Sequence, residues 1–250
     1  MGGVGQVLLT GAAGSVAGQL LPGLEGWARL RLTDRVEPPS MAGAETVRGD
    51  LEDAAFVDSV MEGVDAAVHL AANADAQSEW DEVRGPNLEA PVNILAAAAR
   101  HGVRKLVLAS SVHAVGQYSK QGRRGITTDL PVAPCCPYGA SKAFVEAAGR
   151  QHAYRHDASV ICLRFGATTR VPMAREVLPG WFGPEDLAQM IRLSVESEVR
   201  FGIYFGVSAA ELGVWDIENA RRELGYEPHC QVGPYLETAP EVEGWGLCPT

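Results

Sequence analysis

A tyrosine and a lysine four residues apart, Tyr138 and Lys142 in the stretch PCCPYGASKAF, are the pair in this sequence best suited to acid–base chemistry. On a helix this spacing places both side chains on one face, where they reach the same cleft. A phenol with a pKa near ~10 is a poor base at neutral pH, but a neighbouring ammonium favours the phenolate and lowers that pKa. With the Ser111 hydroxyl to hold the reacting oxygen, these residues predict proton abstraction from an alcohol.

Two adjacent cysteines, Cys135 and Cys136, precede this pair and offer a competing interpretation of the same stretch. The chain has five cysteines, without CxxC spacing or a cluster of His and Cys along the sequence. This pattern predicts reduced thiols, with no metal site and no disulfide framework. Because the sequence shows neither a base nor a ligand partner for Cys135 and Cys136, we interpret them as residues at the lip of a pocket.

A glycine-containing loop, LLTGAAGSVAG, lies near the start of the sequence. Gly11 and Gly14 allow the backbone to turn tightly and to approach a pyrophosphate, which would lie at the N-terminal end of the next helix. Asp34 follows Gly14 by about 20 residues, the spacing of an acid that accepts hydrogen bonds from an adenosine ribose. Its carboxylate would repel a 2′-phosphate, so the loop predicts NAD. The neighbouring Arg35 keeps NADP as an alternative.

These residues lie at the ends of short apolar runs that alternate with helix-like segments. The runs, typical of buried parallel strands, are residues 6–10, 28–34, 46–50, 66–71, 105–110, 159–165 and 203–208. Helices are predicted near residues 15–24, 53–62, 87–101, 138–154, 184–197 and 216–224. The alternation predicts an α/β fold, a Rossmann-like doubly wound parallel sheet. We expect residues 1–165 to form the NAD-binding domain and residues 166–250 a small substrate-binding cap interleaved with the last strand.

Charge and hydropathy exclude several classes of partner. The net charge is −10, which is unsuited to nucleic acid because phosphate binding needs a positive surface. The sequence contains neither an apolar segment of membrane-spanning length nor an export signal. We therefore expect a cytoplasmic protein with a small-molecule substrate, without nucleic-acid or membrane binding.

In their order along the chain, the motifs resemble the extended short-chain dehydrogenase/reductase superfamily, which includes NAD-dependent epimerases and dehydratases. They are TGAAG (10–14), Asp34, GDL (49–51), HLAA (69–72), Asn87, ASSVHAVG (109–116) and YGASK (138–142). The resemblance implies NAD as the cofactor. The cofactor-binding residues that it implies are Gly11, Ala13, Gly14, Ser15, Val16, Asp34, Arg35, Asp50, Leu51, Leu70, Ala71, Ala72, Asn87, Tyr138 and Lys142.

The same resemblance implies a division of roles among the residues of the active site. Tyr138 would remove the alcohol proton as hydride passes to NAD, Ser111 would hold the reacting oxygen, and Lys142 would bind the nicotinamide ribose. The positive nicotinamide would add to the effect of the lysine on the phenol. Asn87 would brace the helix behind the active site.

Within the superfamily, the chain is most similar to uronate dehydrogenases, which oxidise the C1 hydroxyl of galacturonate or glucuronate with NAD. The stretches are SSVHAVGQY (110–118), LRFGATT (163–169), GWFGPEDLAQMI (180–191) and VWDIENARRELGYEP (214–228). The implied substrate-binding residues are Asp75, Ser111, Val112, His113, Tyr138, Ala167 and Arg175, with Arg170 as a second candidate for the arginine that binds the uronate carboxylate. Val112 and Ala167 replace an asparagine and a serine of that family. A related polyhydroxylated substrate therefore also fits the sequence.

Some of these residues have plainer interpretations. His113 would otherwise be a packed loop histidine, and Asp75 a solvated loop acid. His69 we interpret as a satisfied strand-end residue near the cofactor. The alanine-rich segment 93–100 predicts a helix that in relatives pairs with the Tyr138 helix across a homodimer. Its alternative is close packing onto the sheet.

Three functions follow from these patterns. The first is an NAD-dependent dehydrogenase acting on a small sugar acid or related substrate. The second is an epimerase or dehydratase that retains its NAD. The third is a non-catalytic NAD(P)-sensing regulator, a class that commonly loses the tyrosine and lysine that this chain keeps.

Overall fold

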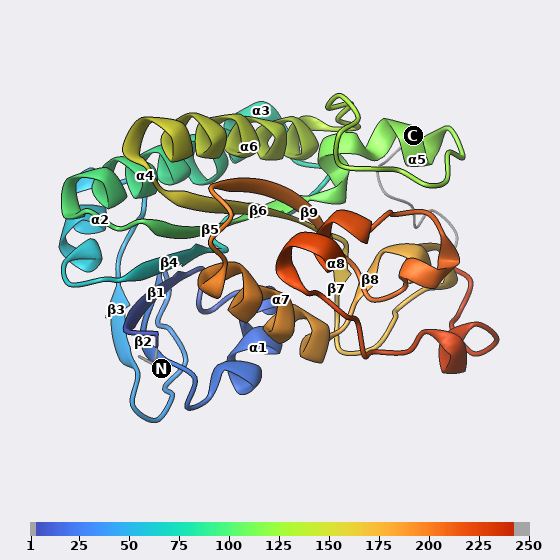
Figure 1. Ribbon diagram of the computed structural model, residues 1–250, viewed down its shortest axis with the longest axis horizontal. Coiled ribbons are helices and arrows are strands. Elements are labelled where there is room, and N and C mark those ends of the chain that lie inside the picture. The colour runs from blue at the N-terminus through green and yellow to red at the C-terminus, as the bar shows by residue number, and fades with distance from the viewer. Residues whose placement is uncertain (1–3, 243–250) are drawn as a thin grey trace.

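Seven parallel strands form the centre of the computed structural model, which describes residues 4–242 (Figure 1). Their order in the sheet is β3-β2-β1-β4-β5-β6-β9. They span Gln6–Thr10 (β1), Arg29–Asp34 (β2), Glu45–Arg48 (β3), Ala66–His69 (β4), Lys105–Ser111 (β5), Ser159–Phe165 (β6) and Phe201–Gly206 (β9). The chain order reverses between β1 and β4, and the carboxyl ends of strands at such a point are where ligands bind in this architecture.

Helices cover both faces of the sheet, so the predicted doubly wound fold is confirmed (Figure 1). One face is covered by α2 (Ala54–Met61), α4 (Ala90–His101) and α6 (Pro137–His156). The other is covered by α1 (Ser15–Leu20) and α7 (Pro184–Glu196), which pack against each other. Each predicted strand and helix has a counterpart in the structure, with ends displaced by a few residues.

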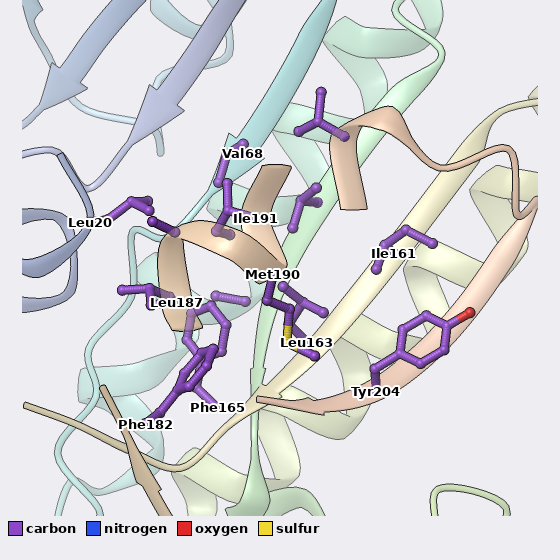
Figure 2. Close-up of a cluster of buried hydrophobic side chains, with 14 of the residues drawn as sticks. Leu20, Val68, Ile161, Leu163, Phe165, Phe182, Leu187, Met190, Ile191 and Tyr204 are labelled. Atoms are coloured by element: carbon purple, nitrogen blue, oxygen red, sulfur yellow. The ribbon is translucent and has the colours of Figure 1, made fainter. Parts of the chain in front are cut away.

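Two apolar cores lie between the sheet and these helices. The first joins the sheet to α1 and α7, with Val68 and Leu163 from strands packed against Leu187 and Ile191 from α7 (Figure 2). The second lies beneath α2, α4 and α6 on the opposite face. Because β9 and α7 follow residue 165 in the chain, the C-terminal part contributes one strand to the sheet and one helix to its cover.

The helix that contains Tyr138 has well-defined ends. At its start the side chain of Cys136 accepts a hydrogen bond from the backbone N–H of Gly139 (3.3 Å), and Pro137 occupies the first turn, where its missing N–H costs nothing. Its last turn is followed by Asp157 in the left-handed conformation (φ 50°). These ends fix where the first turn of α6 meets the sheet.

A continuous helical stretch precedes β5 and contains a wider turn. It consists of α3 (Trp80–Arg84), a π-helical turn (Gly85–Glu89) and α4. The π turn holds the fully buried Asn87. Such turns insert a residue into a helix and are frequent at functional sites, and here the wider turn directs Asn87 inward.

The remaining elements lie beside the carboxyl ends of β5 and β6 (Figure 1). They are α5 (Gly116–Lys120), the short strands β7 (Ala167–Thr168) and β8 (Trp181–Phe182), and α8 (Glu218–Leu224). A small apolar cluster that includes Leu178, Trp181 and Val232 holds this region together. In the described part of the chain, no helix combines the length and the apolar character that crossing a bilayer requires.

Candidate active site

The three predicted catalytic side chains meet at the carboxyl end of β5. Ser111 is the last residue of β5, and Tyr138 and Lys142 lie in the first two turns of α6, all three buried. The Ser111 and Tyr138 side chains are hydrogen-bonded to each other. The Lys142 Nζ lies 5.7 Å from the centroid of the Tyr138 ring and donates a hydrogen bond to the Ala109 carbonyl (2.9 Å).

Burial shifts both titrating groups toward their neutral forms. It raises the pKa of Tyr138 to about 12, although the hydrogen bond with Ser111 opposes the rise. It lowers the pKa of Lys142 to about 8. The expected lowering of the tyrosine pKa is therefore not found in the chain alone, because the cost of burying a phenolate exceeds the stabilisation by its neighbours.

Asn87 connects the π turn to α6. Its amide nitrogen donates to the Ser141 hydroxyl (3.0 Å) and to the Asn73 carbonyl (2.9 Å), and its oxygen accepts from the Asn73 N–H (2.7 Å). Ser141 stands beside Lys142 in the chain. The bracing position expected for Asn87 agrees with these contacts.

A buried ion pair connects α6 to the sheet one turn beyond Lys142. The Glu146 carboxylate accepts two hydrogen bonds from the Arg164 guanidinium (2.7 and 2.8 Å) and one from the Ser110 hydroxyl (2.6 Å). Arg164 is 1% exposed and Glu146 3%. The network joins α6, β5 and β6 directly behind Ser111, and the sequence patterns gave no indication of it.

A cavity of about 720 Å³ lies over the glycine loop. Gly11 has φ +72°, and a side chain there would place its Cβ 2.6 Å from the backbone nitrogen of Ala71. The Ala13 N–H donates to Asp34 Oδ2 (3.0 Å), so the acid also orders the loop. Ten predicted cofactor residues line this cavity: Gly11, Ala13, Gly14, Asp34, Arg35, Asp50, Leu51, Leu70, Ala71 and Ala72.

A second cavity, of about 610 Å³, begins where the first ends, since Ala74 lines both. The predicted residues in its lining are Ser15, Val16, Ser111, Val112, His113, Tyr138 and Ala167. Among the further lining residues that sequence reasoning missed are Lys120, Thr168, Glu176 and Trp215. They come from α5 and from segments around the short strands, whose place beside the active site no motif indicates.

Neither predicted arginine lies in the lining of this second cavity. Arg175 forms an ion pair with Glu241 (3.1 Å) and is half-exposed, whereas Arg170 is exposed. Asp75 is also exposed and accepts a hydrogen bond from the Gln77 N–H (2.8 Å). Substrate binding by Asp75, Arg170 and Arg175 stays a prediction that this geometry does not support.

His113 lies between the tyrosine and the two cysteines. Its ring meets that of Tyr138 edge to face at 5.5 Å, and its Nδ1 lies 3.6 Å from Cys135 Sγ and 3.5 Å from Cys136 Sγ. Burial lowers its pKa to about 4. The inference that the cysteines have no ligand partner is therefore wrong, because the fold brings the histidine beside them. Cys135 is moreover disulfide-bonded, against the expectation of reduced thiols, while Cys136, Cys162 and Cys230 are free.

His69 is only partly satisfied, which corrects the sequence-based interpretation. Its Nδ1 is hydrogen-bonded to the Thr10 hydroxyl (2.8 Å) in the neighbouring strand. Its Nε2 is buried without a hydrogen-bond partner. Burial, reinforced by the positive charge of Lys142, lowers the pKa of His69 to about 3.

Comparisons with known proteins agree with this geometry. The chain is 34% identical to an NAD-dependent glucose-6-phosphate dehydrogenase of Haloferax volcanii (89% of this chain, 92% of the relative) and 33% identical to a uronate dehydrogenase of Pseudomonas putida (89% and 83%). A variant uronate dehydrogenase of Agrobacterium tumefaciens, solved with NAD, has a TM-score of 0.86 at 27% identity, over 96% of this chain and 92% of that one. Residues 7–168 match the model of the NAD dependent epimerase/dehydratase family. The chain therefore belongs to the NAD-dependent epimerase/dehydratase family.

Proposed function

We propose that the chain is an NAD-dependent dehydrogenase that oxidises a hydroxyl group of a small sugar acid or a related polyhydroxylated substrate. The observation that supports this best is the hydrogen-bonded Ser111–Tyr138 pair in the wall of the second cavity. That cavity adjoins the one over the glycine loop. Relatives named for the oxidation of glucose 6-phosphate and of uronates point to the same class of reaction.

The residues of the glycine-loop cavity fit NAD. Only a glycine fits at position 11, because a Cβ would clash with the Ala71 backbone. Without a side chain there, a pyrophosphate can approach the backbone of the loop closely. The Asp34 carboxylate lies in the lining, where it would accept hydrogen bonds from the adenosine ribose and disfavour a 2′-phosphate. When bound, NAD accepts the hydride that leaves the substrate carbon.

The residues of this chain handle the proton. Ser111 would hydrogen-bond the reacting oxygen, and Tyr138 would take its proton as the C–H bond breaks. A phenol with a pKa of about 12 needs positive charge nearby to act as a base. The Lys142 ammonium supplies part of it, and the positive nicotinamide would supply more.

The second cavity suits a single sugar unit rather than a sugar nucleotide. Its volume of about 610 Å³ lies in the usual range for small ligands. Ser111, Thr168 and Glu176 offer polar groups for hydroxyls, and Lys120 is the lysine among the described residues of the lining. We propose that a substrate carboxylate, if present, lies toward Lys120 rather than toward an arginine.

The proposal also covers the oligomeric state and the location of the protein. Val92 and Phe144 are exposed apolar residues of α4 and α6, which pack side by side, and we propose that these helices form a homodimer interface. We also propose a cytoplasmic location: the free thiols at Cys136, Cys162 and Cys230 fit a reducing compartment, although the disulfide at Cys135 is uncommon there.

The test is NADH formation with a panel of sugar acids, sugar phosphates and neutral sugars. Release of free NADH with at least one substrate is expected, whereas an epimerase that retains its cofactor would release none. Tyr138→Phe should lower kcat by about 10²–10⁴-fold, the usual contribution of a positioned acid–base group, with NAD affinity retained. Full turnover by this variant would disprove the mechanism.

A further inference from the structure

We propose that, after reduction of the chain, His113, Cys135 and Cys136 form a binding site for one soft divalent metal ion such as Zn²⁺, and that the bound ion blocks the substrate cavity. The metal site does not depend on the proposed function, whereas the inhibitory effect rests on it. The site would lie at the edge of the cavity that contains Ser111 and Tyr138.

The spacing of the three ligand atoms fits tetrahedral zinc. The His113 Nδ1 lies 3.6 Å from Cys135 Sγ and 3.5 Å from Cys136 Sγ, and all three atoms lie within 4.8 Å of one another. With Zn–S bonds of about 2.3 Å and a Zn–N bond of about 2.0 Å, the N···S edge of a tetrahedron measures roughly 3.6 Å. Both N···S distances therefore match those of a tetrahedral site.

One backbone contact favours a thiolate at Cys136, whereas burial raises the pKa of its thiol. Its Sγ accepts the Gly139 N–H at the start of α6, a helix of 20 residues. Helix N-termini stabilise negative charge and favour thiolate over thiol. The neighbouring Cys135 Sγ is held against Gly116, where a side chain would place its Cβ only 2.3 Å from that sulfur.

Cys135 must be released from its disulfide before it can bind a metal. A phosphine reductant gives up two electrons and takes the oxygen of a water molecule as its phosphine oxide, while the two protons of that water convert the two sulfurs to thiols. The ion then displaces one proton from Cys135 and one from Cys136, forming two metal–sulfur bonds and one bond to the His113 nitrogen. Zinc keeps a fourth position, which water would fill.

A bound ion would interfere with substrate through His113. The imidazole lines the substrate cavity and contacts the Tyr138 ring. Coordination through Nδ1 would fix the ring and place a charged, hydrated ion at the cavity edge. Substrate would then be excluded, whereas the glycine-loop cavity would stay accessible to NAD.

The experiment titrates Co²⁺ and Zn²⁺ into phosphine-reduced protein and into untreated protein. One ion per reduced chain is expected, with a cobalt–thiolate charge-transfer band that Zn²⁺ removes. Untreated protein should lack the band. Cys136→Ser should weaken Zn²⁺ affinity more than about 100-fold, beyond the effect of losing an outer-shell partner. Cys230→Ser, which removes another half-buried free thiol, is the matched control and should bind as the parent does.

The outcomes separate the two proposals. Absence of the band in reduced protein, or an unchanged band in Cys136→Ser, would overturn the metal site whatever the enzyme activity. A bound ion that leaves turnover and KM unchanged would overturn the inhibitory effect. Metal binding without any dehydrogenase activity on the substrate panel would support the site and count against the proposed function. Inhibition that a chelator reverses in the parent, and that Cys136→Ser lacks, is the expected result.

Discussion

At the scale of single residues, burial disfavours the charged forms of both Tyr138 and Lys142. Burial lowers the pKa of Lys142 to about 8 and raises the pKa of Tyr138 to about 12. The phenolate is therefore unfavourable in the chain alone, because the group that would stabilise it becomes neutral first. The tyrosine becomes an effective base only when further positive charge lies in the cleft, which couples proton removal to the presence of the oxidised cofactor.

His69 should make the protein sensitive to acid. The pKa of about 3 in the folded chain, against 6.5 for a free histidine, means that the unfolded state binds the extra proton between these values. Stability is therefore lost as pH falls below 6.5. By about pH 4.5 the loss reaches about 3 kcal/mol. Urea unfolding of His69→Asn at about pH 7 and 4.5 should show a smaller pH dependence than the parent, by up to this amount.

Thr10→Val is the control for this prediction. It removes the hydrogen-bond partner of His69 but no titrating group. Its stability should therefore fall by a similar amount at both pH values. An identical pH dependence in the parent and in His69→Asn would show that the histidine does not titrate as inferred.

Gly11→Ala should impair NAD binding and stability together. The backbone has φ +72°, and the new Cβ would lie 2.6 Å from the Ala71 nitrogen. Backbone strain alone costs about 1–3 kcal/mol, and relief of the clash would displace the loop. Calorimetric NAD titration should show at least a tenfold weaker affinity, about 1.4 kcal/mol. The control is Gly18→Ala, at a helical position with no atom within 4 Å of the new Cβ, and it should keep the NAD affinity of the parent. Equal NAD affinity in both variants would contradict the prediction.

At the scale of elements, the strands other than the largely exposed edge strand β3 were predictable because they are apolar runs that are mostly buried. The catalytic helix was predictable from the spacing of Tyr138 and Lys142 behind a glycine loop. The π turn and α3 were not, since Gly85 and Pro86 disfavour a helix interior and the predicted helix began only at residue 87. The cavity wall around Lys120 and Glu176 comes from short turns, whose position depends on tertiary packing rather than on local pattern.

The Glu146–Arg164 pair should hold α6 in register with β5 and β6. Glu146→Leu leaves a buried guanidinium without its carboxylate, and such a loss costs about 3–5 kcal/mol. The double variant Glu146→Leu/Arg164→Met removes both charges and should recover most of that stability. Denaturant unfolding and kcat should be measured on both variants. If the single and double variants were equally unstable, packing volume rather than the ion pair would explain the loss.

At the scale of the whole molecule, the two parts of the chain share one apolar core. Tyr204 and Leu187, from beyond residue 165, pack in the same cluster as Leu9 and Leu163. The sequence predicted β9 because the last apolar run has the pattern of a buried sheet strand. It could not predict which side chains of the C-terminal part face the cleft, since those side chains belong to segments without regular periodicity.

The proposed homodimer provides the last test. α4 and α6 expose Val92 (46%) and Phe144 (39%) on adjoining helices, and apolar residues that would meet their copies across a two-fold axis suit a self-complementary interface. Analytical ultracentrifugation should give twice the mass of one chain for the parent. Phe144→Glu places like charges across the axis and should raise the dimer dissociation constant at least tenfold, about 1.4 kcal/mol. Val171→Glu, at an exposed position after β7, should remain dimeric; a monomeric parent would refute the interface.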